Sequence, residues 1–166
     1  MDSAIKLYND VSTNCSELIT KSYSTSFSLG IYTLNKRIHK DIYNIYGFVR
    51  FADEIVDTFH DLDKEKYLNK FENETFLSIN ENFSTNPVLH AFQLTVNKFN
   101  IDEKHIKAFL DSMRMDLSMK KFTDQLYDMV KSLNINKFNL VGFSIGSLIA
   151  IEFASKYHDY LKSLTL

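Results

Sequence analysis

Charged and polar side chains share one face of a predicted helix in the segment YGFVRFADEIVD, residues 46–57. Because successive helical residues are rotated by about 100°, Tyr46, Arg50, Asp53 and Asp57 fall within about 60° of one another. Two carboxylates one turn apart can bind a hard cation such as Mg²⁺, which often bridges carboxylates to substrate phosphates. Arg50 adds a cation suited to the same phosphates. The alternative to a metal site is a solvated helix face, and the aspartate pair taken by itself favours that interpretation.

A second stripe of the same helix is apolar, and we expect it to pack against other helices. It consists of Ile42, Ile45, Val49, Ala52, Val56 and Phe59.

Residues 2–118 are predicted to be helical, because apolar residues recur there at spacings of three and four, with only two glycines and one proline. Asn86 followed by Pro87 predicts a helix start, and Asp102 predicts a second N-cap. A break is expected near residues 23–25. The expected helices cover residues 3–21, 24–33, 36–60, 64–82, 86–99 and 102–118.

The pattern changes after about residue 120. FTDQLYDMVKSLNI predicts a short amphipathic helix, and the apolar run after it predicts a buried parallel strand, then a turn, a helix and a second strand. The buried side of the amphipathic helix is expected to be Phe122, Leu126, Met129, Val130 and Leu133. The predicted fold class is therefore mainly α, with a domain over residues 1–118 and a short α/β segment over residues 119–166.

Composition excludes some classes of function. The 166 residues carry a net charge of -2 without a basic cluster, so nucleic-acid binding is not expected. A single cysteine, Cys15, and a start without a signal-peptide pattern predict a cytoplasmic protein. The longest apolar run, FNLVGFSIGSLIAIEFA, is interrupted by Ser144, Glu152 and two glycines, so it is not expected to span a membrane. Peripheral membrane contact stays open.

The segment KSYSTSFSLGIYTLNKRIHKDIYNIYGFVRFADEIVD, with NPVLHAF and SMRMDL after it, resembles the squalene/phytoene synthase family over residues 20–118. These are all-helical head-to-head prenyltransferases that condense two prenyl diphosphates with two to three Mg²⁺ ions. The resemblance implies an isoprenoid-synthase-like helical bundle and a role in isoprenoid or carotenoid biosynthesis. It implies Asp53 and Asp57 as metal ligands, Arg50 and Ser24 as diphosphate-binding residues, and Phe27 and Tyr46 as lining of the prenyl cavity. Asp116 lies in the MxMDL match.

The family's second aspartate motif, on a later helix, has no clear counterpart in this chain. Asp124 and Asp128 repeat the spacing, but we interpret them as the polar side of the amphipathic helix. The resemblance therefore implies a truncated enzyme with weak or no activity. Phytoene, a dehydrosqualene-like product and squalene all stay open as products.

The pattern G-x-S-x-G at residues 142–146 follows a predicted strand and precedes a predicted helix. Residues 120–166 are similar to the nucleophile-elbow segment of α/β hydrolases, and that resemblance implies Ser144 as the nucleophile. A serine needs a base, and His158 is the only histidine downstream of it. His158 is poorly placed near the end of the following helix, so working hydrolase activity is not expected.

Three functions remain open: a weakly active or inactive prenyltransferase, an esterase-like hydrolase fragment, and a noncatalytic helical binding module. A genuine fusion and an error in assembling the gene both fit the two-part sequence. If each part is a piece of a larger domain, the chain is expected to expose apolar faces, to be poorly stable and to self-associate.

Overall fold

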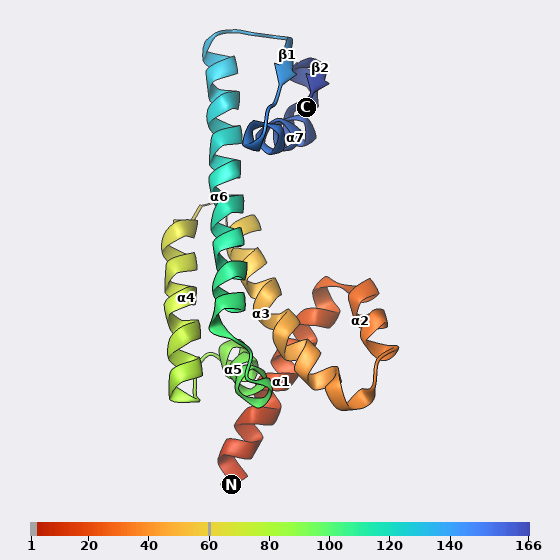
Figure 1. The fold of residues 1–166 in the computed structure, drawn as a ribbon, viewed down its shortest axis with the longest axis vertical. Helices are drawn as coiled ribbons and strands as arrows, with labels where there is room; N and C mark the ends of the chain where they lie inside the picture. The colour runs from red at the N-terminus through yellow and green to blue at the C-terminus, as the bar shows by residue number, and fades with distance from the viewer. Residues whose placement is uncertain (1–2, 60) are drawn as a thin grey trace. The chain divides into compact units, whose positions relative to one another are not determined.

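The computed structural model describes residues 3–59 and 61–166. Within them it contains seven α-helices, two short 3₁₀ helices and one two-stranded sheet, which confirms the predicted mainly-α fold (Figure 1). The predicted helix over residues 36–60 extends onto position 60, which lies outside the described residues. The α-helices are α1 (Ser3–Tyr23), α2 (Thr25–Tyr32), α3 (His39–Asp57), α4 (Lys64–Glu81), α5 (Pro87–Phe99), α6 (Glu103–Ser132) and α7 (Ile145–Tyr157). The remaining elements are η1 (Lys36–Ile38), β1 (Phe138–Val141), η2 (His158–Tyr160) and β2 (Leu161–Thr165).

The chain divides into two compact units, unit 1 up to Met113 and unit 2 from Arg114 onward. The division falls inside α6, slightly before the predicted boundary at residues 118 and 119. The sequence pattern predicts two separate helices here, and this prediction is wrong, because α6 is continuous from Glu103 to Ser132. No glycine or proline lies between those residues, so nothing in the sequence breaks the helix.

Local capping sets the helix starts in unit 1. The Oδ1 atom of Asn86 accepts a hydrogen bond from the backbone N–H of Val88 at 3.0 Å, and Pro87 occupies the first turn, as predicted. Asp102 accepts from the N–H of Lys104 at 2.9 Å before α6. The break near residues 23–25 is also present, because α1 ends at Tyr23 and α2 begins at Thr25.

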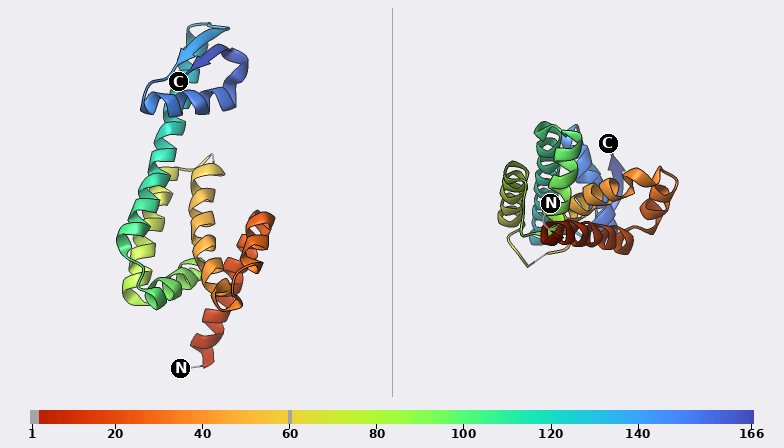
Figure 2. Two further views of the ribbon diagram at one scale, coloured as in Figure 1. Left: turned by 45° about the vertical axis from the view of Figure 1, so that its right-hand side comes forward. Right: turned by 90° about the horizontal axis from the view of Figure 1, so that it is seen from below.

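Phe48 lies at the centre of the unit 1 core, where only 2% of its surface is exposed. Its ring stacks on Phe92 of α5 with centroids 3.9 Å apart, and it also contacts Phe71 of α4 at 5.3 Å and Phe109 of α6 at 5.6 Å. Helices α1 and α5 pack against α3 (Figures 1 and 2). The side chain of Phe48 therefore joins three neighbouring helices to α3.

The buried face of α3 differs from the predicted stripe. Of that stripe, only Ala52 and Val56 are buried, and Phe59 is 43% exposed. The residues that are buried are Asp41, Tyr43, Asn44, Gly47, Phe48, Ala52, Ile55 and Val56. Compared with the predicted stripe, the buried face is rotated around the helix toward Tyr43 and Phe48, and it includes the polar residues Asp41 and Asn44.

Partners on α5 explain why polar residues of α3 are buried. The Nζ atom of Lys98 lies 2.8 Å from Oδ2 of Asp41, and Nδ2 of Asn44 donates to Oγ1 of Thr95 at 3.1 Å. A buried polar group costs little when it is hydrogen-bonded. These partners are far away in sequence, so a helical periodicity could not reveal them.

In unit 2, β1 and β2 pair in parallel, and α7 connects them. The predicted order of helix, strand, helix and strand is therefore present. Phe153 of α7 is fully buried, and the rings of Tyr127 and Tyr157 stack with centroids 4.0 Å apart. The predicted buried side of the amphipathic helix was partly wrong, since Phe122, Met129 and Leu133 are all more than half exposed. Val130 is buried as predicted, and Thr123, which was not predicted, is buried as well.

The buried imidazole of His90 makes the stability of unit 1 depend on pH. Its Nε2 atom lies 2.7 Å from Oδ1 of Asn9, and its Nδ1 atom accepts the N–H of Ser84 at 3.3 Å. Burial lowers the pKa of His90 below its ordinary value. The folded chain therefore favours the neutral ring, whereas the unfolded chain binds a proton near pH 6.5.

We expect the free energy of unfolding to be fully retained above about pH 6.5 and to fall as the pH drops below it, by at most about 1.4 kcal/mol per pH unit. Urea unfolding between pH 7.5 and 5.5 measures this slope. His90→Gln is expected to reduce it, whereas the same change at exposed His105 is the matched control. Equal slopes for His90→Gln and the parent chain would contradict the assignment.

Candidate functional site

Tyr46, Arg50, Asp53 and Asp57 lie along one face of α3, which we name the α3 ridge. The side chains of Arg50 and Asp53 are 24% and 32% exposed, and Asp57 is exposed at the last residue of the helix. The ridge is thus half-open to solvent along its length, while other faces of α3 pack into the core. This arrangement leaves carboxylate oxygens accessible to a ligand.

Arg50 is held by contacts with three side chains. Its guanidinium forms an ion pair with Glu54, lies 3.8 Å from Asp53, and stacks over the ring of Tyr23 with 4.4 Å to the centroid. Burial lowers the pKa of Arg50, but the hydrogen bond and the charge of Glu54 raise it more, so the net direction is upward. The Nε atom of Arg50 is buried and has no hydrogen-bond partner among the described residues. Arg50 is therefore a permanent positive charge, held between an aromatic ring and two carboxylates.

Two further predicted site residues come from the start of α2. The hydroxyl of Ser24 caps α2 by accepting the N–H of Phe27 at 3.2 Å. The ring of Phe27 stacks on Tyr46 of the ridge with centroids 4.1 Å apart and an interplanar angle of 22°. The structure thus brings Ser24 and Phe27 to the Tyr46 end of the α3 ridge.

Tyr23 and Glu54 are not among the predicted site residues. Both contact Arg50, as described above, and set the position of its guanidinium. Glu54 follows Arg50 by four residues on a helix, a spacing that signals an ion pair and could have identified it. Tyr23 lies on α1, and no spacing in the sequence links it to Arg50.

The carboxylates of the ridge fit a metal site in which a substrate supplies some of the ligands, but not one built from protein ligands alone. Among the described residues, no group of three or more histidine, cysteine, aspartate or glutamate side chains is placed to hold a metal ion. Mg²⁺ commonly binds through one or two carboxylates plus substrate phosphates and waters. Asp53 and Asp57, one turn apart, match one side of such a site, and the phosphates would have to supply the other.

The other candidate aspartates lie in unit 2. Asp116 belongs to the part of α6 beyond Arg114. Asp124 accepts a hydrogen bond from the hydroxyl of Tyr157 at 3.3 Å and lies 3.7 Å from Nζ of Lys156. These contacts tie α7 to α6, so Asp124 has a packing role within its own unit.

Ser144 has the backbone geometry of a sharp turn between a strand and a helix. Its φ of 53° and ψ of −125° lie in a region that non-glycine residues rarely adopt, and it precedes α7 directly. A Cβ atom at Gly142 would lie 2.6 Å from the backbone of Ser147, so the turn requires glycine there. The predicted strand–turn–helix is therefore present.

His158 is too far from Ser144 to act as its base. Ser144 caps the start of α7 and His158 caps its end, so 13 helical residues separate them. At a rise of 1.5 Å per residue this is about 20 Å. His158 instead lies 3.5 Å from Asp159, and both side chains are exposed.

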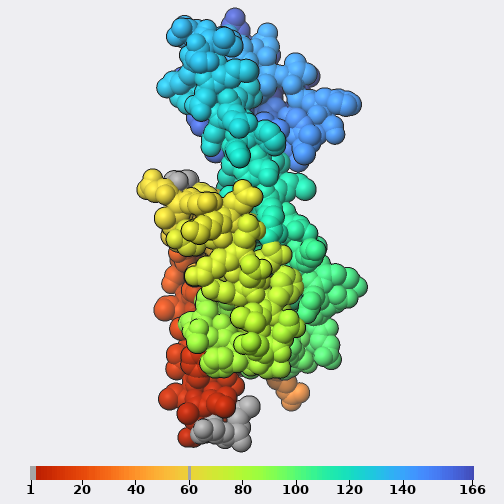
Figure 3. Space-filling model, turned by 90° about the vertical axis from the view of Figure 1, so that its left-hand side faces the viewer, coloured from red at the N-terminus to blue at the C-terminus, as the bar shows by residue number. Residues whose placement is uncertain are grey.

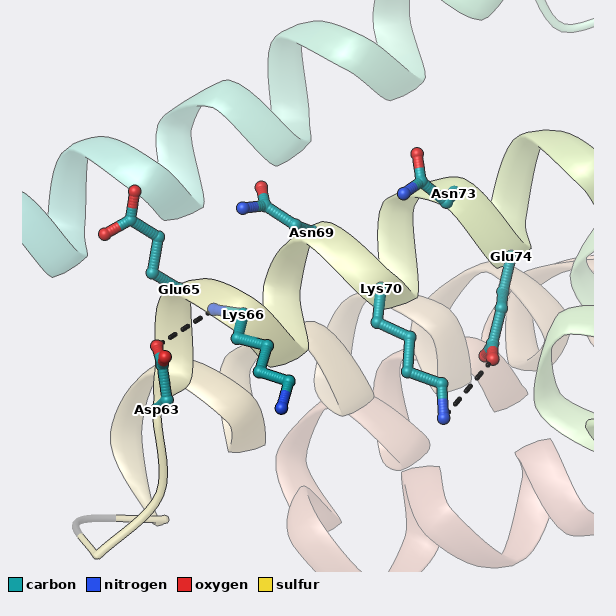
Figure 4. Close-up of a pocket in the computed structure, with 7 residues that line it drawn as sticks. All are labelled: Asp63, Glu65, Lys66, Asn69, Lys70, Asn73 and Glu74. Atoms are coloured by element: carbon teal, nitrogen blue, oxygen red, sulfur yellow. Dashed lines mark hydrogen bonds and ion pairs between the residues drawn. The ribbon is translucent and has the colours of Figure 1, made fainter.

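A hollow of about 550 Å³ lies along α4 (Figure 4), a helix whose atoms are at the surface in the view of Figure 3. Its lining comes from α4 and the residue before it, and some of its polar groups pair with one another. Asp63 accepts the N–H of Lys66 at 3.1 Å, and Lys70 lies 3.7 Å from Glu74. The side chains form a solvated helix face, so we do not treat this hollow as the site.

A family model described as squalene/phytoene synthase matches residues 20–130, which is more than half of the chain. The matched range contains all six predicted residues of the α3 ridge and α2. It ends before Ser144. Comparison with curated proteins and with solved structures gave no match.

Proposed function

The chain belongs to the squalene/phytoene synthase family, and we propose that its α3 ridge binds the diphosphate group of a prenyl diphosphate, the substrate class that the family implies. One observation supports this proposal above the others. Ser24 contacts Phe27, and the ring of Phe27 stacks on Tyr46. Tyr46 comes one helical turn before Arg50 and its neighbour Asp53 on α3, so an aromatic pair lies on the same ridge as a cation and carboxylates. An amphiphilic substrate needs such a junction of apolar and charged groups.

In the proposed mechanism, Asp53 and Asp57 would hold Mg²⁺, which would supply positive charge to stabilise a departing diphosphate. The guanidinium of Arg50 donates hydrogen bonds to the diphosphate oxygens, with its orientation set by Glu54 and Tyr23. Ser24 can donate its O–H while its oxygen caps α2. Phe27 and Tyr46 pack against the prenyl chain and exclude water from the reacting carbon.

We further propose that the chain alone is weakly active or inactive in head-to-head condensation. The described residues supply one carboxylate pair, whereas the family uses a second motif on a later helix. Incubation with geranylgeranyl or farnesyl diphosphate tests this, with pyrophosphate release measured with and without Mg²⁺. Mg²⁺-dependent release supports a surviving active site. Mg²⁺-dependent binding without release supports the noncatalytic binding module, and no binding contradicts the proposed site.

Self-association is a further part of the proposal. In unit 2 the exposed fractions of Val141, Phe143 and Ile145 are 71%, 90% and 61%. Contiguous exposed apolar side chains favour contacts between copies. Sedimentation velocity should show a concentration-dependent increase in mass, and a monomer at all concentrations would contradict this expectation.

We also propose a cytoplasmic location. No helix within the described residues is long and apolar enough to cross a membrane.

An esterase-like activity at Ser144 is the second candidate, because the strained turn exposes a serine between a strand and a helix. The distance to His158 argues against it, since an unactivated serine is a weak nucleophile. A serine-directed fluorophosphonate probe tests this candidate. Labelling that is lost in Ser144→Ala but kept in Ser147→Ala would favour it.

A further inference from the structure

Apolar side chains are exposed on α2 and on the turn that leads to α3. The exposed fractions of Leu29, Tyr32, Leu34 and Ile38 are 70%, 59%, 46% and 37%. Figures 1 and 2 show α2 and this turn standing out from the side of α1 and α3. We name this surface, with Lys36 and Arg37, the α2 tip.

Hydrogen bonds hold the α2 tip in one shape. The Oδ1 atom of Asn35 accepts the N–H of Arg37 at 3.0 Å and caps η1. The Nε2 atom of His39 donates to the carbonyl of Leu34 at 2.9 Å, and the His39 ring meets the edge of Tyr32 at 6.1 Å. The apolar side chains therefore belong to a preformed surface.

The α2 tip carries positive charge without compensation. No aspartate or glutamate occurs between Leu18 and Lys40. Lys40 pairs with Asp10 at 3.4 Å, but within the part of the chain that the structure describes Lys36 and Arg37 form no ion pair. Two unpaired cations thus lie beside four exposed apolar side chains.

We propose that the α2 tip binds the surface of a lipid bilayer that carries anionic headgroups. Leu29 and Tyr32 enter the interface between headgroups and hydrocarbon, where leucine and tyrosine side chains are stable. Lys36 and Arg37 lie among the headgroups, where each cation adds to the attraction. A folded protein partner would equally cover apolar side chains, but the unpaired cations beside them favour an anionic surface. The proposal does not depend on the prenyltransferase assignment.

Co-sedimentation of the full chain with phosphatidylcholine vesicles, with and without phosphatidylserine, tests the proposal. We expect binding to the vesicles that contain phosphatidylserine, weakened by salt. Lys36→Ala and Arg37→Ala should each weaken it by about fivefold, and the double variant by about 30-fold. Leu29→Ser should weaken it as well, because it removes apolar area from the interface.

Matched controls lie on α4, where Lys66→Ala with Lys70→Ala removes two exposed cations and Leu77→Ser replaces a side chain that is 54% exposed. These should bind as the parent chain does. The proposal is overturned if the parent chain stays in the supernatant, if the Lys36/Arg37 double variant binds unchanged, or if the α4 controls lose binding equally. The assay contains no prenyl diphosphate, so its result is separate from that of the turnover assay.

Discussion

Replacing Phe48 with alanine is expected to lower the free energy of unfolding of unit 1 by about 3–5 kcal/mol. The substitution removes a buried ring and its contacts with Phe71, Phe92 and Phe109, which lie on three different helices. The cavity left behind cannot collapse easily, because α4, α5 and α6 all border it. A domain of this size has a total stability of about 5–15 kcal/mol, so the variant should be close to unfolding.

Hydrogen exchange in increasing urea measures the effect, because peptides from α3 and α5 report unit 1 separately from unit 2. Phe99→Ala is the matched control, since it removes the same ring from α5 at a site that is 51% exposed. The control should cost less than about 1 kcal/mol. If the two variants lose equal stability, Phe48 is not the centre of the core.

The order of helices could be predicted because its signals are local. Asn86 and Pro87 mark the start of α5, because they act on the backbone of the residues next to them. The break before Thr25 depends on neighbouring polar residues. The rotation of α3 could not be predicted in the same way. Isoleucine and valine suggested one face, but the aromatic stack around Phe48 and the partners of Asp41 on α5 selected another.

Sequence spacing placed the polar residues of the ridge on one helical face, since Tyr46, Arg50, Asp53 and Asp57 depend only on helical geometry. The same spacing marks Asp53 and Glu54, three and four residues after Arg50, as its ion-pair partners. It could not predict that Tyr23 approaches the guanidinium from another helix. A metal or diphosphate ligand therefore has to bind beside a guanidinium whose position is set partly by local ion pairs and partly by a tertiary contact.

Replacing Asp53 with asparagine is expected to change diphosphate binding in opposite directions with and without Mg²⁺. Without Mg²⁺, the substitution removes a negative charge 3.8 Å from the Arg50 guanidinium, so inorganic pyrophosphate should bind more tightly. With Mg²⁺, the variant lacks one of the two proposed metal ligands, so pyrophosphate binding should weaken by about 100-fold. Titration calorimetry under both conditions measures the two constants.

The inversion of sign separates metal bridging from damage to the fold, because a misfolded ridge would weaken binding in both conditions. Asp61→Asn removes the same charge just beyond α3 and off the ridge, so it should leave both constants nearly unchanged. Arg50→Ala should weaken binding in both conditions, since the guanidinium attracts the phosphate oxygens with or without a metal. If Asp53→Asn tightens pyrophosphate binding in the presence of Mg²⁺ as well, then Asp53 acts only as a competitor for Arg50, and the proposed metal site on α3 is wrong.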